Sequence, residues 1–547
     1  MYLCLLPSIY YRINSFWNNL KIKSMKKNLL TLITLCIAFT AFSQQIAQGY
    51  VYNDANQNGR KERRETGIPN VAVSNGSDVV LTDSKGFYSI PVSEGNTIFV
   101  IKPSGYKTPV DGDFIPQFYY HHKPEGSPES FTYKGVSPTG KLPKSIDFAL
   151  YKYDEPENFS AVLFGDPQPY SMDDIDYFTR KIVYNVEAKE NTLFGISLGD
   201  IVGDNLTLHI PYKESMRHLQ LPWYNVMGNH DMNYDAITDE LSDETFERNF
   251  GSANYSFNYG KAHFIILDDI LYPDPRGGKG YWGGYREDQL KFVENNLKFV
   301  PKDRLVVVSQ HIQMKDDSGN SFRLSDRQTM FDLLKDYENV LFLSAHTHFQ
   351  DQIEYTEVHG WKGSKPLHEY NVGTTSGDWY SGKMDEKGLP DATMRDGTPQ
   401  GYALLNIDGN QYNVDYRAAG READYQMNIY APKVVPHKGR TTSQIYVNFF
   451  MGSPNDVVEY RIDNGKWRKM RYTVMHDPNY LTKLAEWDFT EELLPGRRPS
   501  NPVNCTHLWS GGLQLDLEPG THTIEVRATD RFGKTHYGKR TYQLLKK

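Results

Sequence analysis

Cysteine, long apolar runs and excess positive charge are all scarce in this chain of 547 residues. Its three cysteines, Cys4, Cys36 and Cys505, are too few for a disulfide framework or a cysteine-rich zinc site. No apolar run reaches the roughly 18 residues that a membrane-spanning helix needs, so we expect no transmembrane anchor. A formal charge of −8 provides no general basic surface to replace the counterions of nucleic acid, so we expect no nucleic-acid scaffold as a partner.

The rest of the composition is typical of a folded protein with several domains. Hydrophobic residues make up 39 % of the chain and charged residues 23 %, which excludes an intrinsically disordered protein. At about 100–200 residues per domain, the length predicts about three domains.

The pattern at the start of the chain predicts export. Residues 1–24 form an upstream extension, after which two lysines at 26–27 precede a mostly apolar stretch at 29–42. Ala41 and Ser43 are small residues of the kind that a signal peptidase recognises. We therefore expect residues 1–43 to comprise the extension and a signal peptide, and the mature protein to be periplasmic, extracellular or attached to the cell surface.

Residues 44–157 alternate short apolar runs with turn signals, which predicts an N-terminal β-sandwich. Residues 158–420 instead alternate strand-like apolar runs with helical patterns, including helices expected over 290–300 and 330–337. Residues 421–547 return to strands and predict an immunoglobulin-like C-terminal β-sandwich. The predicted fold class is therefore α/β, with a central α/β sandwich between two β-sandwiches.

Part of the N-terminal region has the spacing of a calcium-binding loop. Asp54, Asn56 and Asn58 alternate before Gly59, and Glu65 follows the glycine by six positions. In such a loop alternating side chains surround one ion, glycine makes the sharp turn, and the last carboxylate binds through both oxygens. The segment resembles the calcium-binding repeat modules of bacterial surface adhesins, which implies a structural calcium ion. A polar hairpin without metal is the alternative.

Metal-capable side chains follow six apolar runs of the middle region. They are Asp166 and Gln168, Asp200 and Asp204, Asn229 to Asp231, Asp268 and Asp269, His311, and His346 and His348. Ligands of open α/β sheets gather at the carboxyl ends of strands, so one fold would bring these groups together. Oxygen and imidazole ligands without thiolates suit Mn, Zn, Fe or Mg.

This ordered set resembles the calcineurin-like metallophosphoesterases. The segments that carry the resemblance are Asp166-x-Gln168, Gly199-Asp200, Gly228-Asn229-His230-Asp231, His311 and His346-x-His348. The regions on either side resemble the N- and C-terminal domains that accompany a bacterial branch of this superfamily.

The resemblance implies a centre of two divalent metal ions. One ion would be bound by Asp166, Gln168, Asp200 and His348. The other would be bound by Asp200, Asn229, His311 and His346, with Asp200 bridging the two. His230 would be the catalytic imidazole beside the leaving oxygen, and Asp204 is the candidate acid that orients it.

Gln168 departs from the family pattern, because most of the superfamily has histidine there. An amide oxygen is a weaker and harder ligand than imidazole. We therefore expect the ion at this position to bind less tightly, and we favour Mn as the physiological metal.

The resemblance implies a phosphoesterase in which a metal-bridging hydroxide attacks phosphorus and His230 protonates the leaving group. The leading hypothesis is hydrolysis of phosphomonoesters. One alternative is a phosphodiesterase acting on nucleotides, phospholipid headgroups or surface polymers. Another is a surface protein that binds glycan or protein and has a vestigial middle domain. Trp282 and Trp379 lie in glycine-rich loops expected to overhang the site, where they would either stack on substrate or pack the loops.

Overall fold

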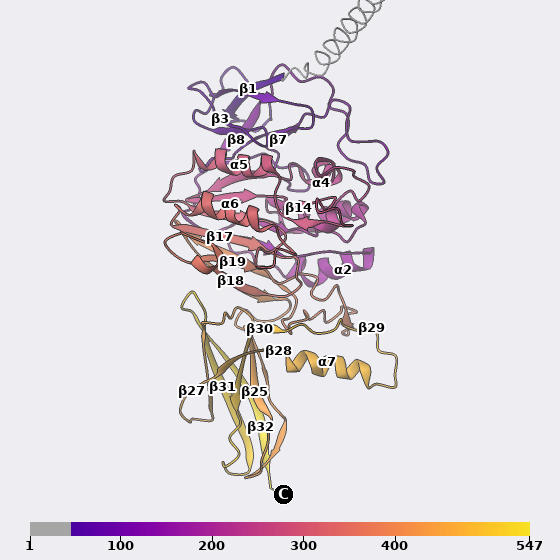
Figure 1. Cartoon of the computed structure of the whole chain (residues 1–547), viewed down its shortest axis with the longest axis vertical. Coiled ribbons are helices and arrows are strands. Elements are labelled where there is room, and N and C mark those ends of the chain that lie inside the picture. The colour runs from indigo at the N-terminus through magenta and orange to yellow at the C-terminus, as the bar shows by residue number, and fades with distance from the viewer. Residues whose placement is uncertain (1–44, 547) are drawn as a thin grey trace, which may run out of the picture.

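The computed structural model describes residues 45–546, so the predicted extension and signal peptide lie outside the described residues. Within 45–546 no helix combines the length and the apolar character of a membrane span. Three regions follow one another along the long axis of the molecule, with a helix-containing middle region between two β-rich ends (Figure 1). This arrangement confirms the predicted α/β core with β-rich regions on both sides.

The N-terminal region contains two four-stranded sheets. The first has the order β4-β1-β8-β6, formed by β1 (Gln45–Asn53), β4 (Phe87–Val92), β6 (Tyr106–Lys107) and β8 (Phe148–Lys152). The second has the order β3-β2-β5-β7, formed by β2 (Ala72–Ser74), β3 (Val79–Leu81), β5 (Thr97–Val100) and β7 (Tyr119–His121).

Two larger sheets form the middle region. The five-stranded sheet has the order β11-β10-β9-β21-β22, with β9 (Asn158–Phe164), β10 (Thr192–Leu198), β11 (Trp223–Val226), β21 (Gly401–Asp408) and β22 (Gln411–Ala418). The six-stranded sheet has the order β12-β13-β16-β17-β19-β18, with β12 (Tyr255–Tyr259), β13 (Ala262–Ile266), β16 (Leu305–Ser309), β17 (Asn339–Ser344), β18 (Asp351–Tyr355) and β19 (Leu367–Asn371). Short strands outside these sheets are β14 (Ile270–Leu271), β15 (Trp282–Gly283) and β20 (Gly382–Lys383).

The two central sheets enclose the main core. Phe194 of β10 meets Phe257 of β12 and Phe264 of β13 at ring-centroid distances of 5.5 and 5.2 Å. Strands β9, β10 and β11 are parallel, as are β13, β16, β17 and β19. Strands buried on both faces are apolar throughout, which is why 305–308 reads as a continuous hydrophobic run.

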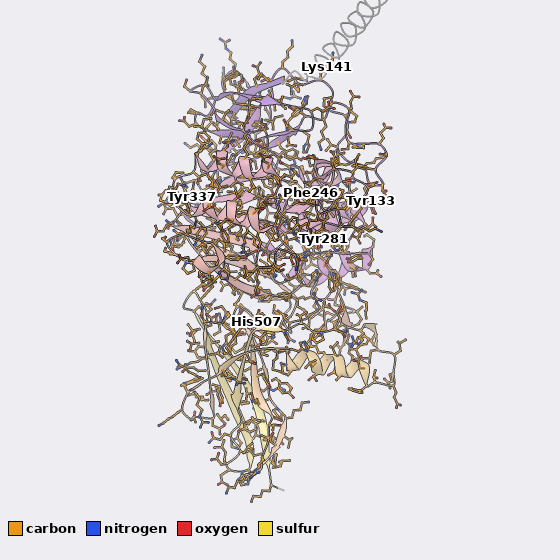
Figure 2. All side chains as sticks on the ribbon, viewed as in Figure 1. Tyr133, Lys141, Phe246, Tyr281, Tyr337 and His507 are labelled. Atoms are coloured by element: carbon orange, nitrogen blue, oxygen red, sulfur yellow. The ribbon has the colours of Figure 1, made fainter. Side chains whose placement is uncertain are left out.

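Helices accompany these sheets: α2 (Met172–Lys181), α3 (His209–Met216), α4 (Glu244–Phe250), α5 (Glu287–Leu297) and α6 (Leu324–Leu334). The last two are the helices predicted over 290–300 and 330–337, but both end earlier than predicted. Val300 and Tyr337 lie beyond them, and the Tyr337 hydroxyl donates to the carbonyls of Leu297 and Val300 at 3.0 Å each (Figure 2). The apolar spacing therefore continues into turns that are themselves packed.

Buried ion pairs join the N-terminal region to the middle region. Lys123 lies 2.7 Å from a Glu244 oxygen and 2.5 Å from a Glu247 oxygen, and all three side chains are buried. Lys102 pairs with Glu155 of its own region at 2.6 Å and also donates to the Asn258 carbonyl of the middle region at 2.6 Å. Breaking such a pair leaves an uncompensated buried charge and costs about 3–5 kcal/mol, so these contacts fix how the regions meet.

The C-terminal region contains two further sheets. One has the order β23-β25-β30-β28, with β23 (Met427–Tyr430), β25 (Gln444–Phe449), β28 (Arg471–Met475) and β30 (Cys505–Gly512). The other has the order β24-β32-β31-β26-β27, with β24 (Val434–Pro436), β26 (Val457–Ile462), β27 (Arg468–Lys469), β31 (Gly520–Thr529) and β32 (Thr535–Leu545).

The long connection between β28 and β30 was not predicted. It contains α7 (Pro478–Asp488), capped by Asp477, and then β29 (Gly496–Arg497). Strand β29 pairs with β20 of the middle region, Arg497 opposite Gly382. His507 of β30 lies at the same boundary (Figure 2), where its Nε2 is 3.0 Å from Asp396. The C-terminal region thus reaches into the loops of the middle region.

Candidate metal centre

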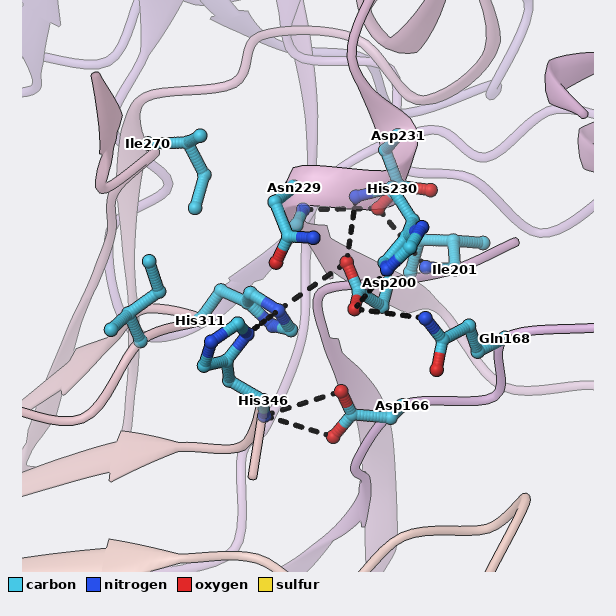
Figure 3. A network of polar contacts seen from close by, with 12 residues as sticks. Asp166, Gln168, Asp200, Ile201, Asn229, His230, Asp231, Ile270, His311 and His346 are labelled. Carbon is cyan, nitrogen blue, oxygen red and sulfur yellow. Dashed lines mark hydrogen bonds and ion pairs between the residues drawn. The ribbon is translucent and has the colours of Figure 1, made fainter. Parts of the chain in front are cut away.

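The carboxyl ends of parallel strands from both central sheets meet at one place (Figure 3). Asp166, Asp200 and Asn229 follow β9, β10 and β11, while His311 and His346 follow β16 and β17. Their side chains point toward one another, as the strand-end argument predicts.

The backbone at these strand ends is in the left-handed region that side-chain-bearing residues rarely adopt. The values of φ are 37° at Asp166, 46° at Asp200, 70° at His346, 56° at His348 and 39° at Gln168. Each such residue costs of order 1–3 kcal/mol, and clusters of them are typical of functional sites. This backbone conformation is found where the side chains point toward one another at the ends of the strands.

Asp200, His311 and His346 offer ligand atoms that all lie within 4.8 Å of one another. The His311 Nδ1 donates to the Leu198 carbonyl at 2.8 Å, which leaves its Nε2 facing Asp200 at 3.3 Å and the His346 Nδ1 at 3.1 Å. Beside them the Asn229 side-chain oxygen is buried and has no hydrogen-bond partner within residues 45–546. Two ring nitrogens, a carboxylate and an orphaned amide oxygen form a donor set that suits a divalent cation.

Charge in this group is tightly balanced. Burial favours neutral His311, but Asp200 and Asp166 outweigh it and raise the pKa of His311 to about 10. Burial lowers the pKa of His346 to about 3 and of His348 to about 4, so both rings are neutral, as metal ligands must be. A cation binding here would displace the proton held by His311.

The second set of predicted ligands is arranged differently. The His348 Nδ1 donates to the Gly377 carbonyl at 3.0 Å, and its Nε2 lies 3.6 Å from an Asp166 oxygen. The Asp166 carboxylate accepts the backbone N–H of His346 at 3.0 and 3.2 Å. Asp166, Asp200 and His348 therefore converge as predicted.

The amide oxygen of Gln168 does not point toward the other predicted ligands. That oxygen accepts the indole N–H of Trp379 at 2.7 Å, and the amide nitrogen lies 3.3 Å from the Tyr170 hydroxyl. The same nitrogen lies 3.3 Å from an Asp200 oxygen (Figure 3). Metal binding by Gln168 stays a prediction, and in this structure its amide oxygen is turned toward Trp379 and not toward Asp200. The reason is a hydrogen-bond donor from a distant loop, which the strand-end pattern does not reveal.

His230 lies beside both sets. Its backbone N–H donates to Asp200 at 2.9 Å, and its Nδ1 is 2.6 Å from Asp204, the partner predicted for it. A carboxylate only accepts, so Nδ1 carries the proton and Nε2 is directed elsewhere. Asp204 also accepts the Tyr234 hydroxyl at 3.0 Å. The His230 side chain is 25 % exposed, enough for a substrate to reach it.

Two buried carboxylates that the sequence reasoning gave no role hold the ligand loops in place. Asp231 accepts the backbone N–H groups of Ile201 and Gly228 at 3.0 Å each. Asp269 accepts those of His311 at 3.0 Å and Ile312 at 2.8 Å. Both stood at predicted strand ends, but nothing in the pattern distinguished a backbone anchor from a ligand.

The two predicted tryptophans differ in what they contact. Trp379 stacks on His348 with ring centroids 4.2 Å apart. Trp282 instead links its own loop to the one before α6, because it donates to the Gly319 carbonyl at 3.1 Å and Arg276 lies 4.4 Å from its ring centroid. Its neighbour Tyr281 faces the centre, 6.2 Å from the His346 ring (Figure 2). Successive residues of extended chain point to opposite sides, so the overhanging ring is one position earlier than predicted.

The proposed calcium loop is closed by hydrogen bonds of its own. The Asp54 carboxylate accepts the backbone N–H groups of Asn58 at 3.2 Å and Gly59 at 2.7 Å. Glu65 accepts that of Ala55 at 3.2 Å, and the Asn56 side chain donates to Glu62 at 3.3 Å. These hydrogen bonds close a polar loop, and both the calcium ion and the metal-free hairpin remain predictions.

Three family models match the chain in order. The model for the N terminal of calcineurin-like phosphoesterase matches residues 55–136, the calcineurin-like phosphoesterase model matches 159–350, and the model for its C terminal matches 369–536. The chain belongs to the calcineurin-like phosphoesterases. The predicted family and its accessory regions are confirmed, and a phosphoesterase with metal-binding residues follows from them.

Solved structures give only distant likenesses. The purple acid phosphatase PPD1 from yellow lupin (Lupinus luteus) seeds is 12 % identical over 65 % of this chain and 69 % of that chain, with a TM-score of 0.35. The GAP50 anchor in the inner membrane complex of Plasmodium is 16 % identical over 48 % of this chain and 84 % of that chain, with a TM-score of 0.30. No curated protein matches the chain. At these scores neither structure indicates what this chain acts on.

Proposed function

We propose that the chain is an exported, dinuclear metal-dependent phosphoesterase that hydrolyses phosphomonoesters. The observation that carries the proposal is the convergence of Asp200, His311 and His346 within 4.8 Å, with His230 alongside. The surface-binding alternative with a vestigial centre is disfavoured, because a lost site has no reason to keep these groups aligned and strained.

The residues fit two cations, with Asp200 between them. Asn229, His311 and His346 would hold one together with Asp200, and Asp166 and His348 would contribute to the other. Two bound divalent cations supply an activated water and neutralise charge on the phosphate. Mn is the favoured metal because oxygen ligands are as numerous as imidazoles, and Zn, Fe and Mg are the alternatives.

His230 would deliver a proton to the leaving oxygen. Its Nδ1–H is bonded to Asp204, which fixes the tautomer, so Nε2 is the atom left to face a substrate. The backbone N–H bond to Asp200 keeps the ring next to the carboxylate shared by the two metal positions. A positioned acid of this kind contributes roughly 10²–10⁴-fold to the rate.

A phosphomonoester is the favoured substrate because a cation stands at the rim. Arg497 of β29 donates to the Trp379 carbonyl. The Trp379 ring stacks on His348 at 4.2 Å, so Arg497 contacts a residue that itself contacts the candidate centre. A guanidinium there favours a phosphate with two negative charges over a diester with one.

A phosphodiesterase is the second candidate, and the rings around the centre are its support. Tyr281 lies beside His346, Tyr170 lies 6.1 Å from the His230 ring, and Trp379 stacks on His348. Such rings would hold the base, sugar or headgroup on the far side of a diester.

The deciding experiment compares matched chromogenic mono- and diesters. The full chain is stripped with a chelator, reloaded with Mn²⁺ and assayed on both, with His230→Ala as the control. The two esters carry the same leaving group. We expect metal-dependent hydrolysis of both, with a faster rate for the monoester. A faster diester would select the second candidate. No hydrolysis together with no bound metal would overturn the phosphoesterase.

Export is tested separately. Expression in a bacterial host followed by fractionation and mass measurement should recover a chain that begins after Ser43 outside the cytoplasm. Recovery of the uncut chain inside the cell would contradict it.

A further inference from the structure

We infer that Gln168 is a positioning residue, held by Trp379, that orients the Asp200 carboxylate instead of binding metal. This inference rests on the proposed metal centre and assigns a role to the C-terminal region, which holds Trp379 in place. It also makes the two metal positions unequal, because the Asp166 side then has one protein ligand fewer than the His311 side.

The orientation of the Gln168 amide follows from the chemistry of its neighbours. An indole N–H can only donate, so the atom 2.7 Å from it must be the amide oxygen. The amide nitrogen then faces the Asp200 oxygen and the Tyr170 hydroxyl, each at 3.3 Å. An amide NH₂ donates hydrogen bonds and has no lone pair for a metal. The oxygen has a second lone pair, but it is turned toward Trp379 while the nitrogen faces Asp200. Ligation beside Asp200 would therefore require the amide to turn over, which breaks its bond to Trp379.

Trp379 is itself held firmly. Its ring stacks on His348 at 4.2 Å with the planes 27° apart, so it contacts a ligand as well as Gln168. Trp379 and Tyr380 both have left-handed backbone, with φ of 48° and 56°. The Tyr380 hydroxyl donates to the Pro167 carbonyl, one residue from Gln168. Loop 374–380 thus contacts the segment after β9 through both Trp379 and Tyr380.

The C-terminal region also holds loop 374–380 in place. Strand β29 pairs with β20, directly after this loop, and Arg497 donates to the Trp379 carbonyl. The backbone N–H of Ser500 donates to the buried Asp378 carboxylate at 2.6 Å. Residues 496–500 therefore hold the loop that carries Trp379 in position. Through Trp379 they also fix the orientation of Gln168 beside Asp200.

The inference is tested by Mn²⁺ binding to the full chain, measured by calorimetry with metal content checked by mass spectrometry. The deciding quantity is whether Trp379→Phe weakens or tightens the weaker Mn²⁺ step. Trp379→Phe keeps a ring over His348 but removes the N–H. If Gln168 is a positioning residue, this change weakens the weaker Mn²⁺ step by roughly tenfold, as loss of an outer-shell partner does. If Gln168 is a ligand, freeing its oxygen leaves that step unchanged or tightens it, which would overturn the inference.

Two further variants separate positioning from simple structural damage. Gln168→Ala should weaken the same step by the same factor, and the double variant should be no worse, because the two side chains act in series. Additive losses would contradict this. Gln168→His, which supplies an imidazole, should tighten the weaker step and leave the tighter one unchanged. Trp282→Phe removes an indole N–H that is bonded to the Gly319 carbonyl and not to Gln168, so it is the matched control and should change neither step.

A readout without metal keeps the inference testable if the proposed function fails. The Trp379 indole N–H resonance, assigned by its loss in Trp379→Phe, should shift upfield in Gln168→Ala because a hydrogen bond is lost. An unshifted resonance would overturn the pairing whether or not the parent binds Mn²⁺. A parent that binds no Mn²⁺ but shows the shift would overturn the metal centre and the proposed function, not the pairing.

Discussion

On one side of Asp200, two imidazole nitrogens face the carboxylate and an amide oxygen stands free. On the other side, His348 is directed at Asp166, but the Gln168 amide is tied to Trp379. Both sides are built at the carboxyl ends of parallel strands, so the fold supplies two positions of similar kind. The difference lies in one side chain and in the loop that restrains it. The fold thus decides where a metal can bind, and the neighbouring loops decide how well.

The largest effect is expected from the residue that belongs to neither side. His230→Ala should keep both metals yet lose roughly 10²–10⁴-fold in turnover on an ester with a poor leaving group, because the proton donor is gone. Rates are compared with those on an activated aryl ester, whose leaving group needs little protonation and whose loss should be smaller. Equal rates of variant and parent on the poor leaving group would refute the role of His230.

Removing one histidine from each side sharpens the comparison. His346→Ala should weaken the tighter Mn²⁺ step by roughly 100-fold, and His348→Ala should weaken only the other step. Metal content after dialysis measures both. If each variant lost the same ion, the two sides could not be as distinct as the geometry makes them.

A smaller effect is expected from the anchor behind the ligands. Asp231→Asn replaces a buried carboxylate that accepts backbone N–H groups from the loops carrying Asp200 and Asn229. Affinity for the tighter ion should fall by roughly tenfold, since outer-shell partners orient ligands. Unchanged Mn²⁺ affinity with unchanged thermal stability would contradict this role.

The smallest effect on the centre is expected from Glu369→Gln, which serves as a reference away from both sides. Burial raises the pKa of Glu369 to about 7, and hydrogen bonds from Tyr355, Ser344 and Met314 only partly oppose it. A carboxyl with a raised folded-state pKa is stabilising below its unfolded pKa, and that contribution is lost as pH rises toward 7.

The stability of Glu369→Gln relative to the parent should therefore increase by about 1 kcal/mol per pH unit between pH 5 and 7. Denaturant unfolding across that range measures it. A difference independent of pH would contradict the assignment.

Much of the centre could be predicted because strand ends in an α/β sheet converge whatever the loops do. Asp166, Asp200, His311 and His346 meet for that reason. Helices α5 and α6 were legible from apolar spacing, but not their ends, since Val300 and Tyr337 continue the spacing in packed turns.

The features that could not be predicted depend on contacts between residues far apart in the sequence, or on which of two neighbouring residues faces the centre. The Gln168 orientation requires Trp379, whose carbonyl is held by Arg497, 118 residues further along the chain. No local pattern encodes such a pairing. Tyr281, and not Trp282, faces the centre because side chains alternate along extended chain, and the start of β15 decides which residue turns inward.

The most direct test of a centre with two unequal positions is phosphomonoester turnover followed while chelator-stripped protein is titrated with Mn²⁺. We expect little turnover through the first equivalent, which fills the His311 side, and a rise with the second, more weakly bound equivalent. Full turnover at one equivalent, or two equivalents bound with a single affinity, would contradict it.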